Sequence, residues 1–117
     1  ECRGPEVRDV LTALNTGHDG GWATIHANGA REVPARLNAL GALAGMGEKA
    51  VSAQAASAFN AVLHMRRSPC GHRWVSEVGV LTRARGPLEC ALALSSTASG
   101  QVTTHEAWAS LARKAGL

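Results

Sequence analysis

Two histidines lie near the start of the chain, at positions from which they could contact an anionic ligand. His18 lies in a glycine-rich turn, and His26 lies near the end of the short apolar segment 22–27. Open α/β sheets place ligand-binding groups where strands end, and either imidazole could donate a hydrogen bond to a phosphate oxygen. Thr24, two residues before His26, could orient that ring. The alternative is that both histidines are satisfied structural residues and that Thr24 only packs.

A carboxylate and a guanidinium open the chain as Glu1-Cys2-Arg3. A positioned carboxylate can orient an attacking water molecule. A guanidinium can contact two oxygens of a carboxylate or a phosphate at once. Residue types and spacing alone are equally consistent with a frayed terminal glutamate and a solvated surface arginine.

These two groups of residues resemble motifs of the type II/IV secretion ATPases. Glu1 and Arg3 match the Gly-Glu-x-Arg segment that ends the Walker B strand in that family. The family's histidine box, Thr-Gly-His-x-Gly followed by Thr-x-His-Ala, is matched by Thr16, Gly17, His18, Gly20, Thr24, His26 and Ala27. The chain is most similar to the tight-adherence (Flp) pilus ATPases and their conjugation relatives. The resemblance covers residues 1–79 and weakens after Gly86.

The resemblance implies a role for each of these residues in a longer parent motor. Glu1 and His26 would be catalytic, while Arg3, His18 and Thr24 would sense nucleotide or couple its state to motion. The parent would use ATP and Mg. It would form a homo-oligomeric, hexameric ring that drives pilus assembly or type II/IV secretion. It would be cytoplasmic, peripheral at the inner face of the cytoplasmic membrane, and would act with an inner-membrane platform protein.

The phosphate-cradling loop of such a motor does not occur in this sequence. No Gly-x-x-x-x-Gly-Lys-Ser/Thr is present, and neither lysine, Lys49 or Lys114, lies in a glycine-rich loop. We therefore expect a C-terminal fragment of a motor domain, from the Walker B glutamate onward. No cofactor-binding residues can be assigned, and the chain alone is not expected to bind ATP tightly or hydrolyse it.

Composition sets further bounds on the chain. Its 117 residues suit one small domain, and a hydrophobic content of 45% is far from that of a disordered chain. The net charge of +3 selects no class of partner. The three widely spaced cysteines favour reduced thiols over a disulfide scaffold. Cys70, His72 and His64 match no structural zinc spacing, so no metal site is predicted.

Apolar periodicity and turn residues predict the order of helices and strands. The expected elements are a helix after Pro5, a buried strand over 22–27, a helix capped by Asn28, a helix over 48–60, strands over 61–67, 72–82 and 88–94, and a last helix after a capping box at Thr103–Glu106.

This order predicts one α/β domain over residues 1–117, a partial RecA-like P-loop NTPase fold with a small antiparallel β extension and a C-terminal helix. Residues 1–60 would hold the end of the Walker B strand, the histidine box and helices, and residues 61–117 the antiparallel strands and last helix. In this fold class the P-loop strand lies next to the strand after Walker B. Its absence would expose an apolar sheet edge, so the isolated chain would self-associate or rearrange.

Two further alternatives stay open. Five arginines near the predicted hairpin could form a docking surface for an adjacent subunit or a platform protein, or simply protect a solvated strand edge: Arg66, Arg67, Arg73, Arg83 and Arg85. Nucleic-acid binding is not favoured, because no aromatic residues interleave these arginines. In place of a pilus or secretion motor, the chain could belong to a non-catalytic interaction module or to a DNA-transfer or competence motor of the same family.

Overall fold

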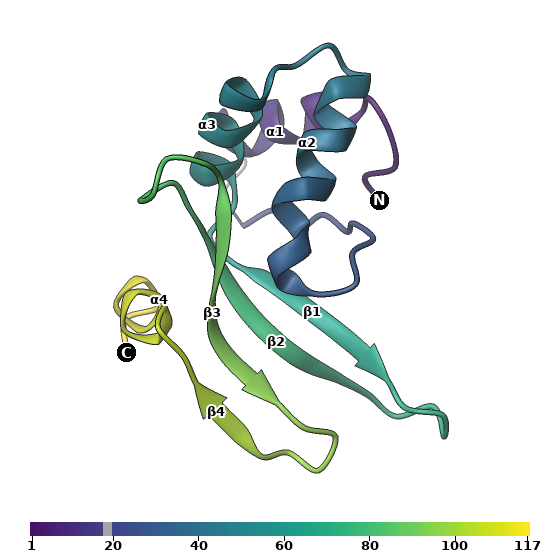
Figure 1. Cartoon of the computed structure of the whole chain (residues 1–117), viewed down its shortest axis with the longest axis vertical. Coiled ribbons are helices and arrows are strands. Elements are labelled where there is room, and N and C mark those ends of the chain that lie inside the picture. Colours follow the sequence, from purple (N-terminus) through teal and green to yellow (C-terminus); the bar gives the residue numbers. More distant parts are fainter. Residues whose placement is uncertain (18–19) are drawn as a thin grey trace.

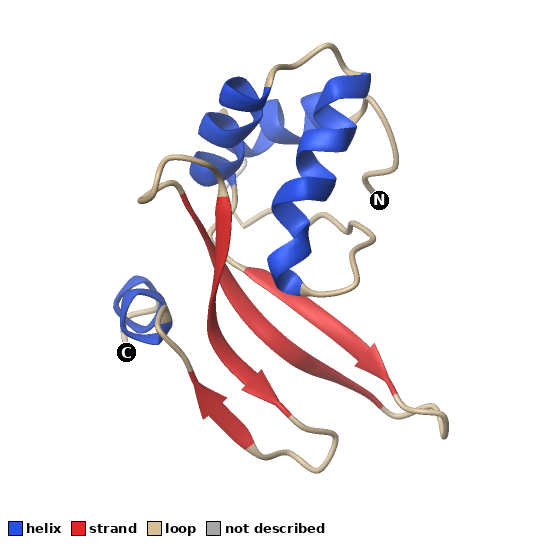
Figure 2. Cartoon of the chain, viewed as in Figure 1, coloured by secondary structure: helices blue, strands red, loops and turns tan. Residues whose placement is uncertain are grey.

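Three of the four α-helices gather at one end of a four-stranded antiparallel sheet in the computed structural model, which describes residues 1–17 and 20–117, and the C-terminal helix lies apart from them (Figures 1 and 2). The strands lie in the order β1-β2-β3-β4, so β1 has a sheet neighbour on one side only. In chain order the elements are α1 (Val7–Asn15), η1 (Ala30–Glu32), α2 (Val33–Leu43), α3 (Glu48–Ala58), β1 (Val62–Arg67), β2 (Arg73–Thr82), β3 (Glu89–Ser96), β4 (Val102–Thr104) and α4 (Trp108–Lys114).

The first helix forms where the sequence predicts it. Val7 and Leu11 lie one turn apart and are completely buried, which gives α1 one apolar face. The Glu6 carboxylate accepts hydrogen bonds from the N–H groups of Arg3 (2.8 Å) and Gly4 (3.1 Å). These bonds hold the opening segment of the chain against the start of α1.

The second helix begins later than expected, and the predicted cap at Asn28 is wrong. The chain first makes the 3₁₀ turn η1, and no side chain caps η1 or α2. Instead the Glu32 carboxylate accepts a hydrogen bond from the Asn28 N–H (3.1 Å). Pro34 lies in the first turn of α2, where its missing N–H leaves no bond unmade, so the regular helix starts at Val33.

The two faces of the sheet are covered by different elements. Leu81 and Leu92 join the main core under the helices, whereas Val80 and Ala93 pack with Ala107 and Leu111 at the α4 end. Neighbouring residues of a strand point to opposite faces, so β2 and β3 supply both clusters. Helices on part of an antiparallel sheet, with a helix at the C-terminus, confirm the coarser α/β prediction.

The segment 22–27 is not the buried strand that we predict from its apolar residues. Only one isolated bridge joins it to other residues that the structure describes, a parallel pairing of Cys2 with Ile25. Trp22 is 83% exposed. A parallel strand is buried when neighbours cover both its edges and faces, and the described chain supplies this segment with a neighbour at a single point.

The predicted capping box at Thr103–Glu106 is also wrong. Thr103 and Thr104 pair with β3 as part of β4, and α4 begins at Trp108 with no side-chain cap. Threonine is β-branched and suits a strand. Backbone bonds to β3 therefore hold these residues in a conformation that a helix cap cannot use.

Close packing of α2 on α3 depends on Gly41. A Cβ atom built on Gly41 would collide with the side chain of Val51, which is completely buried. We expect Gly41→Ala to lower the free energy of unfolding by about 1–2 kcal/mol, because overpacking outweighs the gain in helix propensity. Urea denaturation measures this. In a double-mutant cycle with Val51→Ala, the stability lost in the double mutant should be smaller than the sum of the two single losses. A loss equal to that sum would contradict the proposed contact.

Candidate functional site

A single backbone contact assembles the predicted site residues. The N–H of Cys2 donates a hydrogen bond to the carbonyl of Thr24 (2.7 Å), within the parallel bridge between Cys2 and Ile25. Side chains alternate along extended backbone. Cys2 therefore turns into the core, where it is 3% exposed, while Glu1 and Arg3 turn outward beside Thr24 and His26.

The charged groups of this outer face contact one another. The Arg3 Nε–H donates a hydrogen bond to Glu1 Oε2, and His26 Nε2 lies 3.4 Å from the same oxygen. The hydrogen bond from Arg3 lowers the pKa of the Glu1 carboxyl, and the same bond raises the pKa of the Arg3 guanidinium. A carboxylate is thus held between a guanidinium and an imidazole, and all three are open to solvent.

Four of the five predicted site residues lie together. Glu1, Arg3 and His26 are in contact, and Thr24 lies on the same exposed side of its segment. Within the described chain no hydrogen bond joins the Thr24 side chain to His26, so the predicted orienting contact is not made. The fifth residue, His18, lies outside the described residues.

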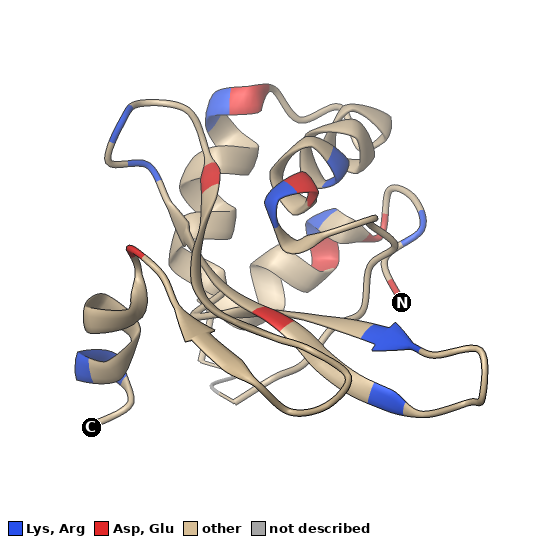
Figure 3. Ribbon diagram, turned by 60° about the horizontal axis from the view of Figure 1, so that its bottom comes forward, with Lys and Arg blue, Asp and Glu red and all other residues tan. Residues whose placement is uncertain are grey.

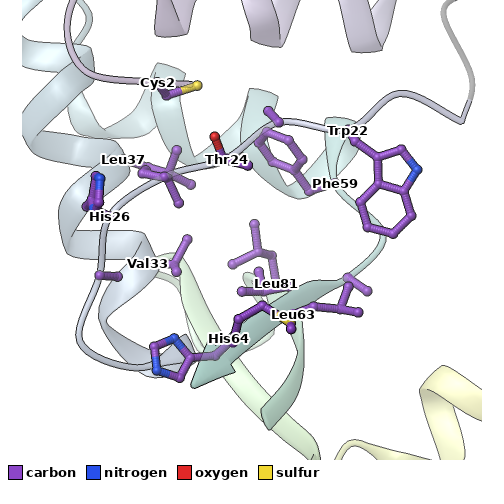
Figure 4. Close-up of a pocket in the computed structure, with 16 residues that line it drawn as sticks. Cys2, Trp22, Thr24, His26, Val33, Leu37, Phe59, Leu63, His64 and Leu81 are labelled. Atoms are coloured by element: carbon purple, nitrogen blue, oxygen red, sulfur yellow. The ribbon is translucent and has the colours of Figure 1, made fainter. Parts of the chain in front are cut away.

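The same segment, residues 22–27, forms one wall of a cavity of about 450 Å³, and both Thr24 and His26 are among the residues that line it. β1 forms the opposite wall, and Leu37, Phe59 and Leu81 lie between the two (Figure 4). Among the described residues, the lining includes two histidines, His26 and His64, but no lysine, arginine or carboxylate. Such a lining suits apolar side chains and lacks the cations that phosphates need.

Nothing in the predicted elements indicates this cavity. Its walls come from segments more than thirty residues apart in the chain: residues 22–27, here called the histidine segment, and β1. One signal was available: Leu63 and Met65 are large apolar residues on an edge strand, where they are 41% and 54% exposed. Exposed apolar side chains beside a hollow indicate a surface that another chain segment covers.

Comparison with known proteins identifies the family of this chain. A family model described as "Type II/IV secretion system protein" matches residues 1–115. Two proteins of Mycobacterium tuberculosis, from strains CDC 1551 / Oshkosh and H37Rv, are each 49% identical over 89 residues. Each is named "Putative conjugal transfer protein". The match covers 76% of this chain and 25% of each relative, so the chain spans about a quarter of their length.

The contact between Arg3 and Glu1 can be tested by titration. Replacing Arg3 with glutamine removes the main cause of the lowered Glu1 pKa, so we expect that pKa to rise toward its ordinary value. Carbonyl-detected NMR over a pH series measures it. Arg8→Gln, on the exposed side of α1, is the control and should leave the Glu1 pKa unchanged. An unchanged pKa in Arg3→Gln would show that the two groups are apart in solution.

The three cysteines should differ in reactivity. Burial raises the pKa of Cys2, and it raises the pKa of Cys90 to about 11. A hydrogen bond with Ser68 lowers the pKa of the exposed Cys70. Since the thiolate is the nucleophile, iodoacetamide should modify Cys70 faster than the other two by about tenfold or more. Mass spectrometry measures the rates, and equal rates in folded protein would contradict the burial of Cys2 and Cys90.

Proposed function

The chain belongs to the type II/IV secretion system protein family, and on that premise we propose that it is the C-terminal part of a motor ATPase. The longer protein would couple ATP hydrolysis to secretion, assembly of a Flp-like pilus, or conjugal transfer. The observation that carries this proposal is the cluster of Glu1, Arg3 and His26 on one face of a parallel pairing.

In that motor Glu1 would orient the attacking water molecule. Its carboxylate is ionised at neutral pH, as a water-positioning group needs, and the hydrogen bond from Arg3, which lowers its pKa, favours the same state. Arg3 would hold Glu1 in place and, with His26, would contact the developing charge on the phosphoryl group. Because Arg3 and His26 both contact Glu1, a change at the phosphate would reach Thr24 and the rest of the histidine segment.

A RecA-like sheet would fit the cavity beside this segment. Strands in one sheet lie about 4.8 Å apart, and an inner strand needs a partner on each side. The histidine segment has Cys2 as its partner on one side, and its other side faces the cavity and β1. We infer that the P-loop strand of the longer protein lies here, next to the strand after Walker B. It would cover the exposed Trp22.

The described residues fit only part of a MgATP site. Glu1, Arg3 and His26 would face the terminal phosphate, and no group of three or more His, Cys, Asp and Glu side chains within the described residues could hold a metal ion. Mg²⁺ commonly uses one or two carboxylates together with substrate phosphates. The remaining contacts would come from the rest of the longer protein, so this chain alone would bind MgATP weakly.

The assembly would be a homo-hexameric ring at the inner face of the cytoplasmic membrane, acting with a platform protein. No helix in the described part of the chain is long and apolar enough to cross a bilayer. The name of the two mycobacterial relatives, conjugal transfer protein, favours DNA transfer as a second candidate process. A non-catalytic interaction module is the remaining alternative, since this chain carries no P-loop.

Calorimetry with MgATP tests the proposal on this chain and on the longer protein that includes a P-loop. Only the longer form should bind, and there Glu1→Gln should lower kcat by about 10²–10⁴-fold while leaving ATP affinity nearly unchanged. Arg8→Gln is the control, because Arg8 is exposed on α1 and makes no ion pair among the described residues. Absence of binding by either form would reject the ATPase and leave the interaction module.

A further inference from the structure

The loop end of the β1–β2 hairpin extends away from the helices and carries three arginines, Arg66, Arg67 and Arg73 (Figures 1 and 3). All three are exposed, and residues 65–75 contain no aspartate or glutamate. Arg83 and Arg85 lie at the other end of the ten-residue strand β2, about 33 Å away along the strand. The arginines of this region therefore form two separate groups.

The three arginines at the loop end have no acidic partner in the described part of the chain. The ion pairs there join Arg3 and His26 to Glu1, and Arg31 to Glu106. Arg67 lies directly opposite Arg73 in the strand register. Like charges facing each other across two strands destabilise a hairpin, so an external anion would relieve a repulsion that the fold leaves in place.

The hairpin end is held in one conformation by its own hydrogen bonds. Ser68 N–H bonds the carbonyl of His72 (2.8 Å), Gly71 N–H bonds the carbonyl of Ser68 (2.9 Å), and His72 N–H bonds Ser68 Oγ (3.1 Å). Gly71 has φ +92, which favours glycine there. A surface already ordered in this way loses little conformational entropy on binding.

Exposed apolar side chains adjoin the arginines on one face. Leu63, Met65 and Arg67 alternate along β1 and so point to the same side. Leu63 pairs with Val78, two residues from the Val80 that packs against the α4 end of the sheet. α4 covers the far part of this face only, and the side chains of Leu63 and Met65 stay exposed. A partner for this face therefore needs carboxylates near Arg67 and Arg73 and apolar groups near Met65.

We propose that this face of the hairpin, formed by Leu63, Met65, Arg67 and Arg73, binds an extended acidic segment of another protein that also carries apolar side chains. A guanidinium fork matches a carboxylate in a bidentate geometry. β1 is the edge strand of the sheet, where an extended segment can lie alongside.

Two other kinds of partner fit less well. The indole of Trp74 donates to the carbonyl of Ser96 (3.2 Å) and stacks on His72, so it is not a free platform for a nucleic-acid base. The apex, residues 68–72, carries no large apolar side chain to enter a bilayer. A flat membrane that touched this apex would not reach Leu63, which lies farther back on the strand.

Fluorescence anisotropy on the full chain tests the proposal with a short labelled peptide of alternating glutamate and leucine. Arg67→Glu with Arg73→Glu should weaken binding by about tenfold or more, and Met65→Gln by severalfold. Arg83→Glu with Arg85→Glu is the matched control: it changes the net charge equally, at the opposite end of β2, and should change affinity by less than about twofold. Circular dichroism melts check that the variants fold. If the variant with Arg67→Glu and Arg73→Glu does not fold, Arg67→Gln with Arg73→Gln replaces it as a milder change.

Several outcomes would overturn the proposal. Equal losses in the two charge-reversal pairs would show non-specific attraction to the net charge. An equal affinity for a peptide with serine in place of leucine would remove the apolar contact. Tighter binding of a single-stranded oligonucleotide or of phosphatidylglycerol vesicles, lost in the Arg67 and Arg73 variant, would assign the surface to that partner instead. No binding of the peptide at millimolar concentration would also reject it.

Discussion

One backbone pairing, Cys2 with Ile25, determines the geometry of the candidate site. Because side chains alternate along both segments, this register turns Cys2 and Ile25 toward the core and leaves Glu1, Arg3 and His26 on the outside. A slip of one residue would exchange the two sets and bury charges. The burial of Cys2 therefore specifies the site indirectly, since the apolar side of the pairing selects the register and the polar side follows from it.

The histidine segment has two sides with different requirements. Its polar residues lie beside the exposed charges of Glu1 and Arg3, which tolerate solvent, whereas most of the cavity that the segment also lines is apolar, which does not favour solvent. His26 belongs to both, since it contacts Glu1 and lines the cavity. Among the described residues the segment is paired at a single point, so whatever fills the cavity would also support the backbone that carries His26. A strand inserted there would lie beside His26 itself and would hold in place the ring that contacts Glu1.

Local patterns predicted much of the fold, and non-local pairing accounts for what they missed. The apolar spacing of Val7 and Leu11 predicts α1, and the turn Ser68–Gly71 predicts the hairpin, because those signals involve near neighbours. The cap predicted at Thr103 is wrong because Thr103 pairs with Ser95 of β3, and a capping-box pattern takes no account of strand pairing. For the site, the resemblance to a known family groups Glu1, Arg3 and His26. Residue types alone are equally consistent with Arg3 being a solvated surface residue. No sequence signal gave the register that brings them together.

β1 connects the two surfaces of functional interest. Its first half, with Leu63, lines the cavity, and its second half carries Arg66 and Arg67 to the exposed hairpin end. Met65 belongs to both regions, since it lines the cavity and lies on the same face as Arg67. Leu63 does the same, so the apolar part of the hairpin surface borders the cavity, whereas Arg67 and Arg73 do not line it. Within the described chain, the charged part of that surface is therefore separate from the cavity.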